Sequence, residues 1–354
     1  MNTNEPCAAV FPVDEDFMRL PNNDVIQLEG RQQKITYYLT LGGWNISSPN
    51  HIINVIDKFD FSQLDVLVLV NSYHFLEHRV IEDIIRIAAQ NNIEIYWARD
   101  DRDVDRQAIE EMSDELKVCT SFICNEVAAD ISTVLHNFDI PIVSIAGVGP
   151  YVQKFQVGLK LRNDFVSAGY KTLYISSRRE GVLFGARIFP EFLFENGMSF
   201  SEKIYGINHY IEKLCREEQP DVVLISVPGE TMELSQKHKL DFGYLASIVF
   251  SAIKPDVSIL NLYNLKYTDE FLEEQKSYCK YRFGAVPDLF YATYTGIVES
   301  SLQEAWIQYY HGDKIYDDLL TKNKLFNEAD VMNGLFFERV MEILEEYGSL
   351  DFIS

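Results

Sequence analysis

The stretch "SIAGVGPYVQKFQVGLKLRNDFVSAGYKTLYISSRR" (residues 144–179) decides the fold of this chain. It opens with an apolar run, turns through a loop that contains Gly147 and Gly149, and continues from Lys154 with a helical period. Gly169 stands where a helix commonly stops, and a second apolar run follows it. A strand, a loop, a helix and a second strand in this order predict one unit of a parallel sheet covered by helices.

The N-terminal part of the chain repeats this alternation. "LDVLVLVNS" (64–72) is nearly continuous and rich in β-branched residues, which is typical of a strand buried on both faces of a parallel sheet. Strands are predicted at 36–45, 64–72, 93–101 and 121–124, and helices at 79–92, 103–116 and 128–137. We therefore expect a Rossmann-like or flavodoxin-like α/β domain over residues 1–138.

A second domain is predicted over residues 139–354, because the pattern begins afresh at "FDIPIVSIAG" (138–147). The stretch 286–327 alternates and contains tyrosines, which favours strands or edge hairpins. The remaining predicted elements are strands at 221–229 and 256–264 and helices at 202–217, 242–253 and 329–348, the last one amphipathic. The fold class is α/β with mainly parallel sheets in both domains.

Composition narrows the range of ligands. The formal net charge of −23 argues against nucleic acid and against an anionic membrane surface, both of which attract cationic proteins. Basic residues nevertheless gather in one part of the sequence, which fits a small anionic ligand better than DNA. They are Lys154, Lys160, Arg162, Lys171, Arg178, Arg179 and Arg187.

The sequence also bears on location. No apolar run approaches the ~20 residues of a membrane helix, and the beginning of the chain lacks the basic and apolar regions of a secretory signal. The five cysteines form no CxxC pair and are expected to be reduced thiols of a cytoplasmic protein. No metal site is predicted; "NSYHFLEH" (71–78) offers two histidines and a glutamate but no further ligand.

The loop "GVGPYVQK" (147–154) resembles a phosphate-binding loop in part. Such a loop needs free backbone amides, a helix N-terminus and a lysine that reaches the phosphates, and Gly147, Gly149 and Lys154 supply these features. In the standard motif a glycine precedes the lysine and a hydroxyl residue follows it. Here Gln153 and Phe155 occupy those positions. Two interpretations stay open, a working triphosphate loop and a structural turn that holds a lysine.

Two further strand ends extend this candidate site. "PDVVLISVPGE" (220–230) ends in Pro228 and Gly229, but Ser226 stands where an NTPase carries a magnesium-binding aspartate, and Glu230 is the nearest substitute. Ser177 and Arg178 follow the strand after the helix, where a hydroxyl and a guanidinium could bind a phosphate or a carboxylate. The alternatives are a buried strand with its turn and a solvated loop.

The ordered blocks "KFQVGLKLRNDFVSAGYKTLYISSRREGVLFGARIFPEF" and "SEKIYGINHYIEKLCREEQPDVVLISVPG" carry a family resemblance. The chain resembles the peptide-maturation-system proteins found beside radical-SAM maturases in clostridial natural-product clusters. The resemblance implies an accessory cytoplasmic protein that acts with a precursor peptide and a radical-SAM maturase. It also implies a second domain similar to dimerising P-loop ATPases and GTPases, with an altered loop, so a homodimer is a further expectation.

Three functions follow from these observations. The leading hypothesis is an accessory protein of peptide maturation that binds ATP, GTP with Mg²⁺, or another phosphorylated anion. Its binding residues would be Gly147, Gly149, Lys154, Ser177, Arg178, Pro228 and Gly229, with Glu230 as the candidate catalytic residue. The first alternative is a non-catalytic pseudo-NTPase that holds the peptide or the maturase. The second is a transferase that uses a nucleotide-activated donor.

Overall fold

The computed structural model describes residues 6–44, 46, 48, 51–100, 106–312 and 325–350, the last four of these by backbone only. The chain divides into two compact units. The first comprises Met1–Cys124 and Arg178–Ala186, and the second comprises Asn125–Ser177 and Arg187–Ser354. The prediction of two α/β units with mainly parallel sheets is confirmed. The boundary expected after residue 138 lies inside the second unit, because the connection that follows Cys124 packs on that unit.

The first unit is built on a sheet of order β2-β3-β1-β5-β6-β7, with β4 paired to β3. Its strands are β1 (Ala8–Phe11), β2 (Val25–Leu28), β3 (Arg31–Thr40), β4 (Ile53–Val55), β5 (Val66–Leu69), β6 (Glu94–Trp97) and β7 (Thr120–Phe122). Only β2 pairs antiparallel among the described strands of this sheet. The parallel strands β3-β1-β5-β6-β7 stand in the order 2-1-3-4-5 of a flavodoxin-like sheet.

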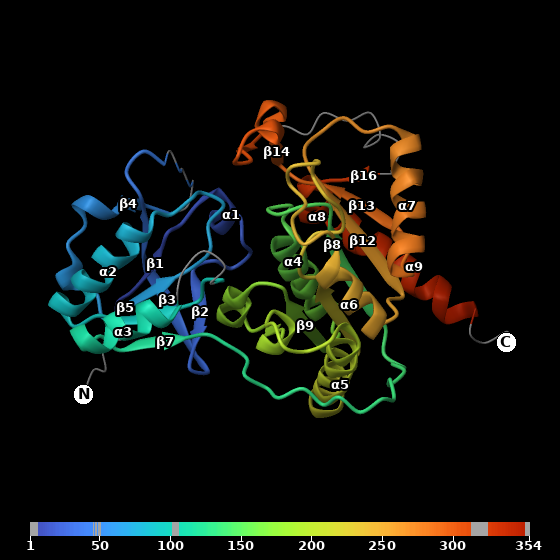
Figure 1. The fold of residues 1–354 in the computed structure, drawn as a ribbon, viewed down its shortest axis with the longest axis horizontal. Helices are drawn as coiled ribbons and strands as arrows, with labels where there is room; N and C mark the ends of the chain where they lie inside the picture. The colour runs from blue at the N-terminus through green and yellow to red at the C-terminus, as the bar shows by residue number, and fades with distance from the viewer. Residues whose placement is uncertain are drawn as a thin grey trace. The chain divides into compact units, whose positions relative to one another are not determined.

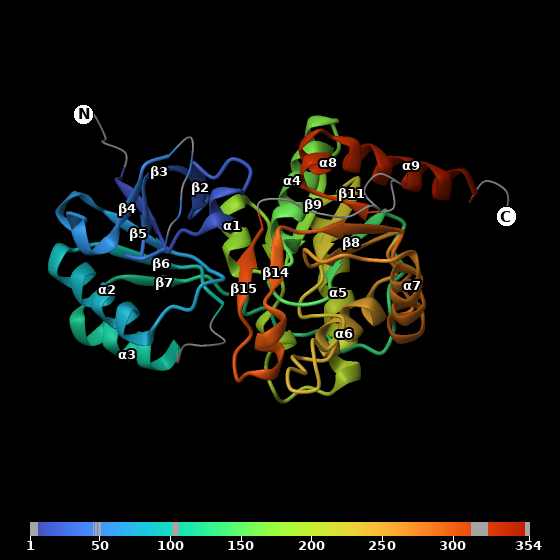
Figure 2. The same ribbon diagram turned by 90° about the horizontal axis from the view of Figure 1, so that it is seen from above.

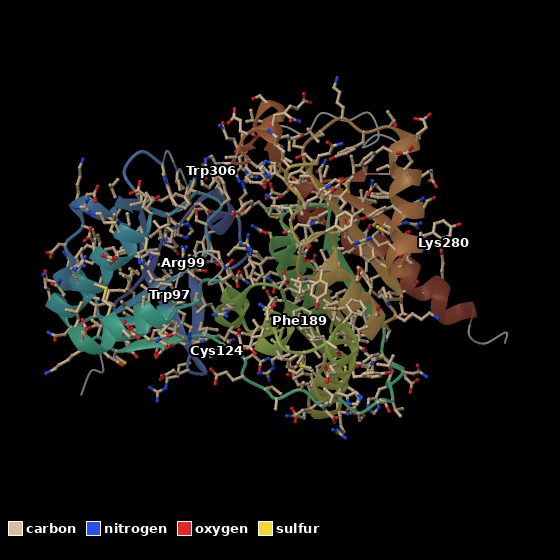
Figure 3. The ribbon with its side chains drawn as sticks, viewed as in Figure 1. Trp97, Arg99, Cys124, Phe189, Lys280 and Trp306 are labelled. Atoms are coloured by element: carbon tan, nitrogen blue, oxygen red, sulfur yellow. The ribbon has the colours of Figure 1, made fainter. Side chains whose placement is uncertain are left out.

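Helices α2 (His78–Asn91) and α3 (Arg106–Leu116) cover one face of this sheet, as Figure 2 shows. The helix predicted at 79–92 is α2. Isoleucines at 81, 84 and 85 form its apolar stripe, and they pack against the core-facing residues of β5 and β6. A short helix, α1 (Glu15–Met18), follows β1 directly. Trp97 ends β6 fully buried, and Arg99 just beyond it donates to the carbonyl of Val70 at 3.2 Å (Figure 3).

The second unit contains a parallel sheet of order β10-β9-β11-β8-β12-β13-β16. Its strands are β8 (Ile142–Gly147), β9 (Thr172–Ser176), β10 (Arg187–Ile188), β11 (Val222–Ser226), β12 (Val257–Leu262), β13 (Leu289–Ala292) and β16 (Leu325–Phe326). A separate antiparallel pair joins β14 (Thr295–Ile297) to β15 (Tyr309–His311). The strands expected within 286–327 are thus β13 to β15 and β16, with residues 313–324 outside the described part.

Helices lie on both faces of this second sheet, as Figures 1 and 2 show. One face carries α4 (Lys154–Ser167), α8 (Glu328–Met332) and α9 (Leu335–Leu350), and the other carries α5 (Phe200–Glu218), α6 (Tyr244–Ala252) and α7 (Asp269–Phe283). A helix near 128–137 was predicted, but this segment is extended, because side chains of α5 hydrogen-bond to its backbone. The predicted C-terminal helix is broken between α8 and α9, where Gly334 has a φ of +83°.

The quoted stretch folds as expected. β8 leads through a loop into α4, Gly169 follows the helix end with a φ of +95°, and β9 pairs with β11. Gly158 inside α4 brings the helix close to the sheet, since a Cβ there would overlap the ring of Tyr174 on β9. Glycine in the helix interior costs ~1 kcal/mol relative to alanine, and the close helix–strand approach explains why it is tolerated.

Candidate functional site

The loop between β8 and α4 lies at the switch point of the second sheet. β8 lies between β11 and β12. After β8 the chain forms β9, β10 and β11 on one side of it and then crosses to form β12 on the other side. In open parallel sheets, ligands bind beyond the carboxyl ends of the strands at this type of position. The loop that the sequence indicated as a candidate site thus lies at this switch point.

Two non-glycine residues of the loop have the left-handed backbone conformation that glycine usually adopts. Gln153 has a φ of +54° and Tyr151 a φ of +60°, both in the left-handed region. This conformation costs non-glycine residues roughly 1–2 kcal/mol. Gln153, which stands where a standard phosphate loop has glycine, is buried and directly precedes the first residue of α4. The bend before α4 is thus formed by non-glycine residues in the left-handed conformation.

Lys154 points along the end of β11. Its ammonium group donates to the carbonyl oxygen of Val227 at 2.7 Å and also to that of Gly229. Gly229 has a φ of +71°, and a Cβ there would overlap the carboxylate of Asp241. The structure therefore brings together Lys154, Pro228 and Gly229, as the sequence predicted, but the lysine is bound to the turn itself.

Side chains of the same unit fill the interior of the loop. A Cβ on Gly147 would overlap a methyl group of Val152, and a Cβ on Gly149 would overlap the hydroxyl of Tyr263. Tyr263 donates its hydroxyl hydrogen to the carbonyl of Pro150 at 2.8 Å. Asn261 Nδ2 donates to the carbonyl of Val152 at 2.7 Å. The space above both glycines is therefore taken by protein atoms.

The hydroxyl of Ser226, at the position where an NTPase carries a magnesium-binding aspartate, contacts other protein groups. Its hydroxyl lies 2.8 Å from the hydroxyl of Tyr174 and donates to the carbonyl of Lys154 at 3.2 Å. These bonds fasten the first turn of α4 to β9 and β11. The serine at the aspartate position thus joins the helix to the sheet.

Glu230 lies at the same edge and is only 7% exposed. Its backbone N–H donates to Asp241 at 3.4 Å. Burial raises the pKa of Tyr263 well above its usual value, and Tyr309 and Glu230 raise it further. Burial also raises the pKa of Tyr309, with Tyr151 and Glu230 as smaller causes. A buried carboxylate among protonated phenols makes this edge unfavourable for a polyphosphate.

The tyrosines and Asn261 were not predicted as site residues. The rings of Tyr151 and Tyr309 are 5.0 Å apart, and those of Tyr263 and Tyr309 are 6.2 Å apart. Asn261 and Tyr263 follow from the rule that strand ends converge, since both lie at the carboxyl end of "DVSILNLYN" (256–264). Tyr309 belongs to β15 of the antiparallel pair, and the residues around it do not mark the end of a parallel strand, so the same rule could not have found it.

Ser177 and Arg178 stand at the point where the chain passes from the second unit to the first. Ser177 ends the segment of the second unit, and Arg178 begins the segment Arg178–Ala186 of the first. The Arg178 guanidinium pairs with Glu180 at 2.8 Å, and Glu180 also accepts from the N–H of Asn71 at 2.9 Å. Burial raises the pKa of Glu180, and Arg178 partly offsets the effect. The predicted anion-binding arginine therefore has a carboxylate partner within its own segment.

The first unit has a switch point of its own, between β1 and β5. The carboxylate of Asp14, which follows β1, accepts from the N–H of Phe17 at 2.8 Å and from that of Tyr73, beyond β5, at 2.9 Å. Burial raises the pKa of Asp14 to about 6, and the neighbouring Asp16 contributes. Tyr73 also donates its hydroxyl to Glu15. Amides that could face an anion are here bonded to an internal carboxylate.

These geometries test the expected cofactor and metal. The residues present do not fit a magnesium nucleotide: the glycines are covered, Lys154 is bound to carbonyls, and Ser226 fastens helix to sheet. Across the described part of the chain, no group of three or more histidine, cysteine, aspartate or glutamate side chains could hold a metal ion. None of the helices described is long and apolar enough to cross a membrane.

Comparisons with known proteins bear on the fold. No protein-family model matches the chain, and no curated protein matches it. Among solved structures, a DUF1611 family protein from Anabaena variabilis aligns over 81% of this chain and 87% of that one, with a TM-score of 0.56 and 11% identity. The chloroplast FtsY of Physcomitrella patens aligns over 62% and 75%, with a TM-score of 0.29 and 16% identity. The chain is thus similar in its two-unit α/β fold to the DUF1611 protein.

Proposed function

We propose that this chain is a non-hydrolysing accessory protein in the maturation of a ribosomally made peptide. In this proposal the second unit is a pseudo-NTPase, a P-loop-like fold that has exchanged phosphate binding for internal bonds. The resemblance noted in the sequence supports the biological setting: a cytoplasmic protein that acts with a precursor peptide and a radical-SAM maturase. Homodimerisation remains a prediction from that resemblance.

One observation carries the proposal, the two carbonyl bonds of the Lys154 ammonium. A lysine that neutralises phosphoryl charge must direct its ammonium to the phosphates. Here that group lies against the Pro228–Gly229 turn, while Val152 and Tyr263 cover the glycines. A nucleotide would have to displace all three side chains and then lie beside Glu230, which is unfavourable for a polyanion.

Binding of a phosphorylated anion is the second candidate, and one observation favours it. Gln153 and Tyr151 hold the left-handed conformations of a phosphate-type bend at an energetic cost. If Lys154 and Tyr263 moved aside, the amides of this bend would face the ligand. Lys154 and Gly149 would then contact the anion, and Glu230 would position water or metal. The transferase alternative has no comparable support.

Calorimetric titration separates these candidates. Wild type, Lys154→Ala and Lys160→Ala are titrated with ATP, GTP and their Mg²⁺ complexes. Lys160 is the matched control, because it lies on the same helix and pairs with Asp164. We expect no saturable heat for any of the three proteins. Saturable binding by wild type and by Lys160→Ala that is lost in Lys154→Ala would overturn the pseudo-NTPase proposal in favour of anion binding.

A further inference from the structure

The connection from Asn125 to Phe138 lies beside α5 in an extended form, and Figure 1 shows it in green. Two consecutive side chains of α5 hold it there. Asn208 accepts from the N–H of His136 at 2.7 Å and donates to the carbonyls of His136 at 3.0 Å and Ala252 at 2.8 Å. His209 Nε2 donates to the carbonyl of Val134 at 2.7 Å.

These bonds make the connection an ordered part of the second unit. His209 Nδ1 also lies 3.3 Å from the carboxylate of Asp130, so the hold extends along the segment. Connections of this length without helix or strand are uncommon in compact domains, and they usually serve either as tethers or in binding. A tether needs no specific attachment along its course. The attachment by Asn208 and His209 therefore favours binding.

The segment presents both apolar side chains and unused backbone groups. Val134 is 69% exposed and Ile131 49%, and Val127 and Leu135 are exposed as well. Within the residues that the structure describes, the backbone N–H and C=O groups of 127–131 have no protein hydrogen-bond partner. An extended backbone with free donors and acceptors is the template to which a peptide adds as a further strand.

A cavity of about 460 Å³ adjoins the segment at the amino-terminal edge of the sheet. Leu135 and Phe138 line it from the connection, Phe250 from α6 and Phe283 from α7. Its volume is in the range of pockets that hold a small molecule or a large apolar side chain. The last turns of α6 and α7 also meet there, and helix C-termini favour positive charge.

The charge of the region points to a cationic partner. From residue 118 to residue 153 the chain contains Glu126, Asp130 and Asp139 but no lysine or arginine. Lys254 is the cation among the residues that line the cavity, and it is exposed. Basic side chains of an added strand would therefore meet carboxylates along the segment, while apolar side chains would meet Ile131, Val134 and the cavity.

We propose that residues 126–139 and the adjoining cavity bind an extended peptide in which basic and apolar residues alternate, by addition of the peptide as a strand. This goes beyond the proposed function and does not involve loop 147–154. Backbone bonds to 127–131 would supply affinity, the cavity would select an apolar side chain, and Glu126, Asp130 and Asp139 would select positive charge. Because the segment is already ordered, little conformational entropy is lost when the peptide binds.

The test is fluorescence anisotropy with labelled short peptides and the full chain. The probes are an alternating lysine–valine peptide, its glutamate–valine counterpart, and the lysine–valine peptide with alternate backbone amides methylated. We expect saturable binding of the first probe only. Ile131→Ser/Val134→Ser should weaken it about tenfold, an effect of roughly 1.4 kcal/mol. Met332→Ser, at an exposed apolar residue of α8, should leave it unchanged.

A charge exchange makes the test sharper. Glu126→Lys/Asp139→Lys leaves Asp130 and its contact with His209 in place, and it should shift preference from the lysine probe to the glutamate probe. Far-ultraviolet circular dichroism of each variant checks that it is folded. Equal binding of all three probes, binding that is insensitive to both double variants, or no binding at all would overturn the proposal. Each of these results leaves the nucleotide titration unaffected.

Discussion

In the first unit the switch point between β1 and β5 holds a carboxylate, that of Asp14, whereas in the second unit the switch point beside β8 holds an ammonium, that of Lys154. Asp14 bonds to backbone N–H groups, and Lys154 bonds to backbone carbonyls. The Asp14 carboxylate thus takes the N–H groups that an anionic ligand would bind, and the Lys154 ammonium takes the carbonyls that a cationic ligand would bind. The position where this fold class binds ligands is occupied by internal groups in both sheets, with opposite chemistry.

The two units also differ in how the internal charge is balanced. Burial disfavours the ionised form of Asp14 and raises its pKa, and the acidic neighbour Asp16 adds to this effect. The Lys154 ammonium instead donates to two backbone carbonyls, those of Val227 and Gly229. The first switch point should therefore respond to pH in the acidic range, far from the ordinary titration range of a lysine side chain. The following predictions test this contrast.

Removal of one partner of the buried ion pair Arg178–Glu180 in the first unit should have the largest effect. Arg178→Met leaves the Glu180 carboxylate, 2% exposed, without its cation. Loss of one partner of a buried ion pair costs about 3–5 kcal/mol in the free energy of unfolding. Urea unfolding measures it. The double variant Arg178→Met/Glu180→Met should recover most of the loss, and a single-variant cost near zero would show that the pair is not structural.

The pH dependence of the first switch point comes next. The folded pKa of Asp14, about 6, exceeds the ordinary value of 3.8. Its protonation therefore stabilises the folded state below about pH 4, and this contribution is lost as the pH rises to about 6. At 1.36 kcal/mol per unit the change amounts to about 3 kcal/mol. Unfolding free energies of wild type minus Asp14→Asn should fall across this window.

Asp60 supplies the control for that measurement. It is exposed, and hydrogen bonds from Ser62 and Gln63 hold its pKa below the ordinary value. Its contribution should therefore be present at neutral pH and lost on acidification, the opposite sign to Asp14. An Asp14→Asn difference that does not vary with pH would contradict the assignment of a raised pKa.

Gly149→Ala tests the filling of the second switch point. The new methyl group would overlap the Tyr263 ring, and overpacking of this kind costs about 1–3 kcal/mol. Thermal or urea unfolding measures the loss. If Tyr263 is the obstacle, Gly149→Ala should cost much less in a Tyr263→Ala background. Additive effects of the two substitutions would mean that the glycine is required for another reason.

Lys154→Met should have the smallest effect of the four, about 1–2 kcal/mol, because the lysine is partly exposed and two carbonyls lose a donor. Unlike the Asp14 difference, this one should be constant between pH 5 and pH 8. The same unfolding series provides both measurements. A Lys154 difference that changes across that range would remove the contrast between the two units.

The sequence alone was informative wherever neighbouring residues decide the structure. The buried strand at 64–72, the α2 stripe and the path from β8 through α4 to β9 follow from hydrophobic period and glycine position. It also predicted that Lys154, Pro228 and Gly229 converge, because parallel strand ends share one edge. It missed α7, β1 and β2, and it predicted a helix at 128–137 that does not form. There Asn208 and His209 bond to the backbone of His136 and Val134, in positions that a helix over 128–137 would not allow.

What the sequence determined by itself is the architecture: two α/β units, mainly parallel sheets and a glycine-containing loop between a strand and a helix. Only the tertiary structure decided which groups that loop contacts. The direction of the Lys154 ammonium, the cover over Gly147 and Gly149 and the pairing of Arg178 depend on residues far away in the chain, among them Val227, Tyr263 and Glu180. Hydrophobic periodicity and secondary-structure propensity depend on neighbouring residues in the sequence. The partner of a buried charge depends instead on which groups the fold brings within a few ångströms of it.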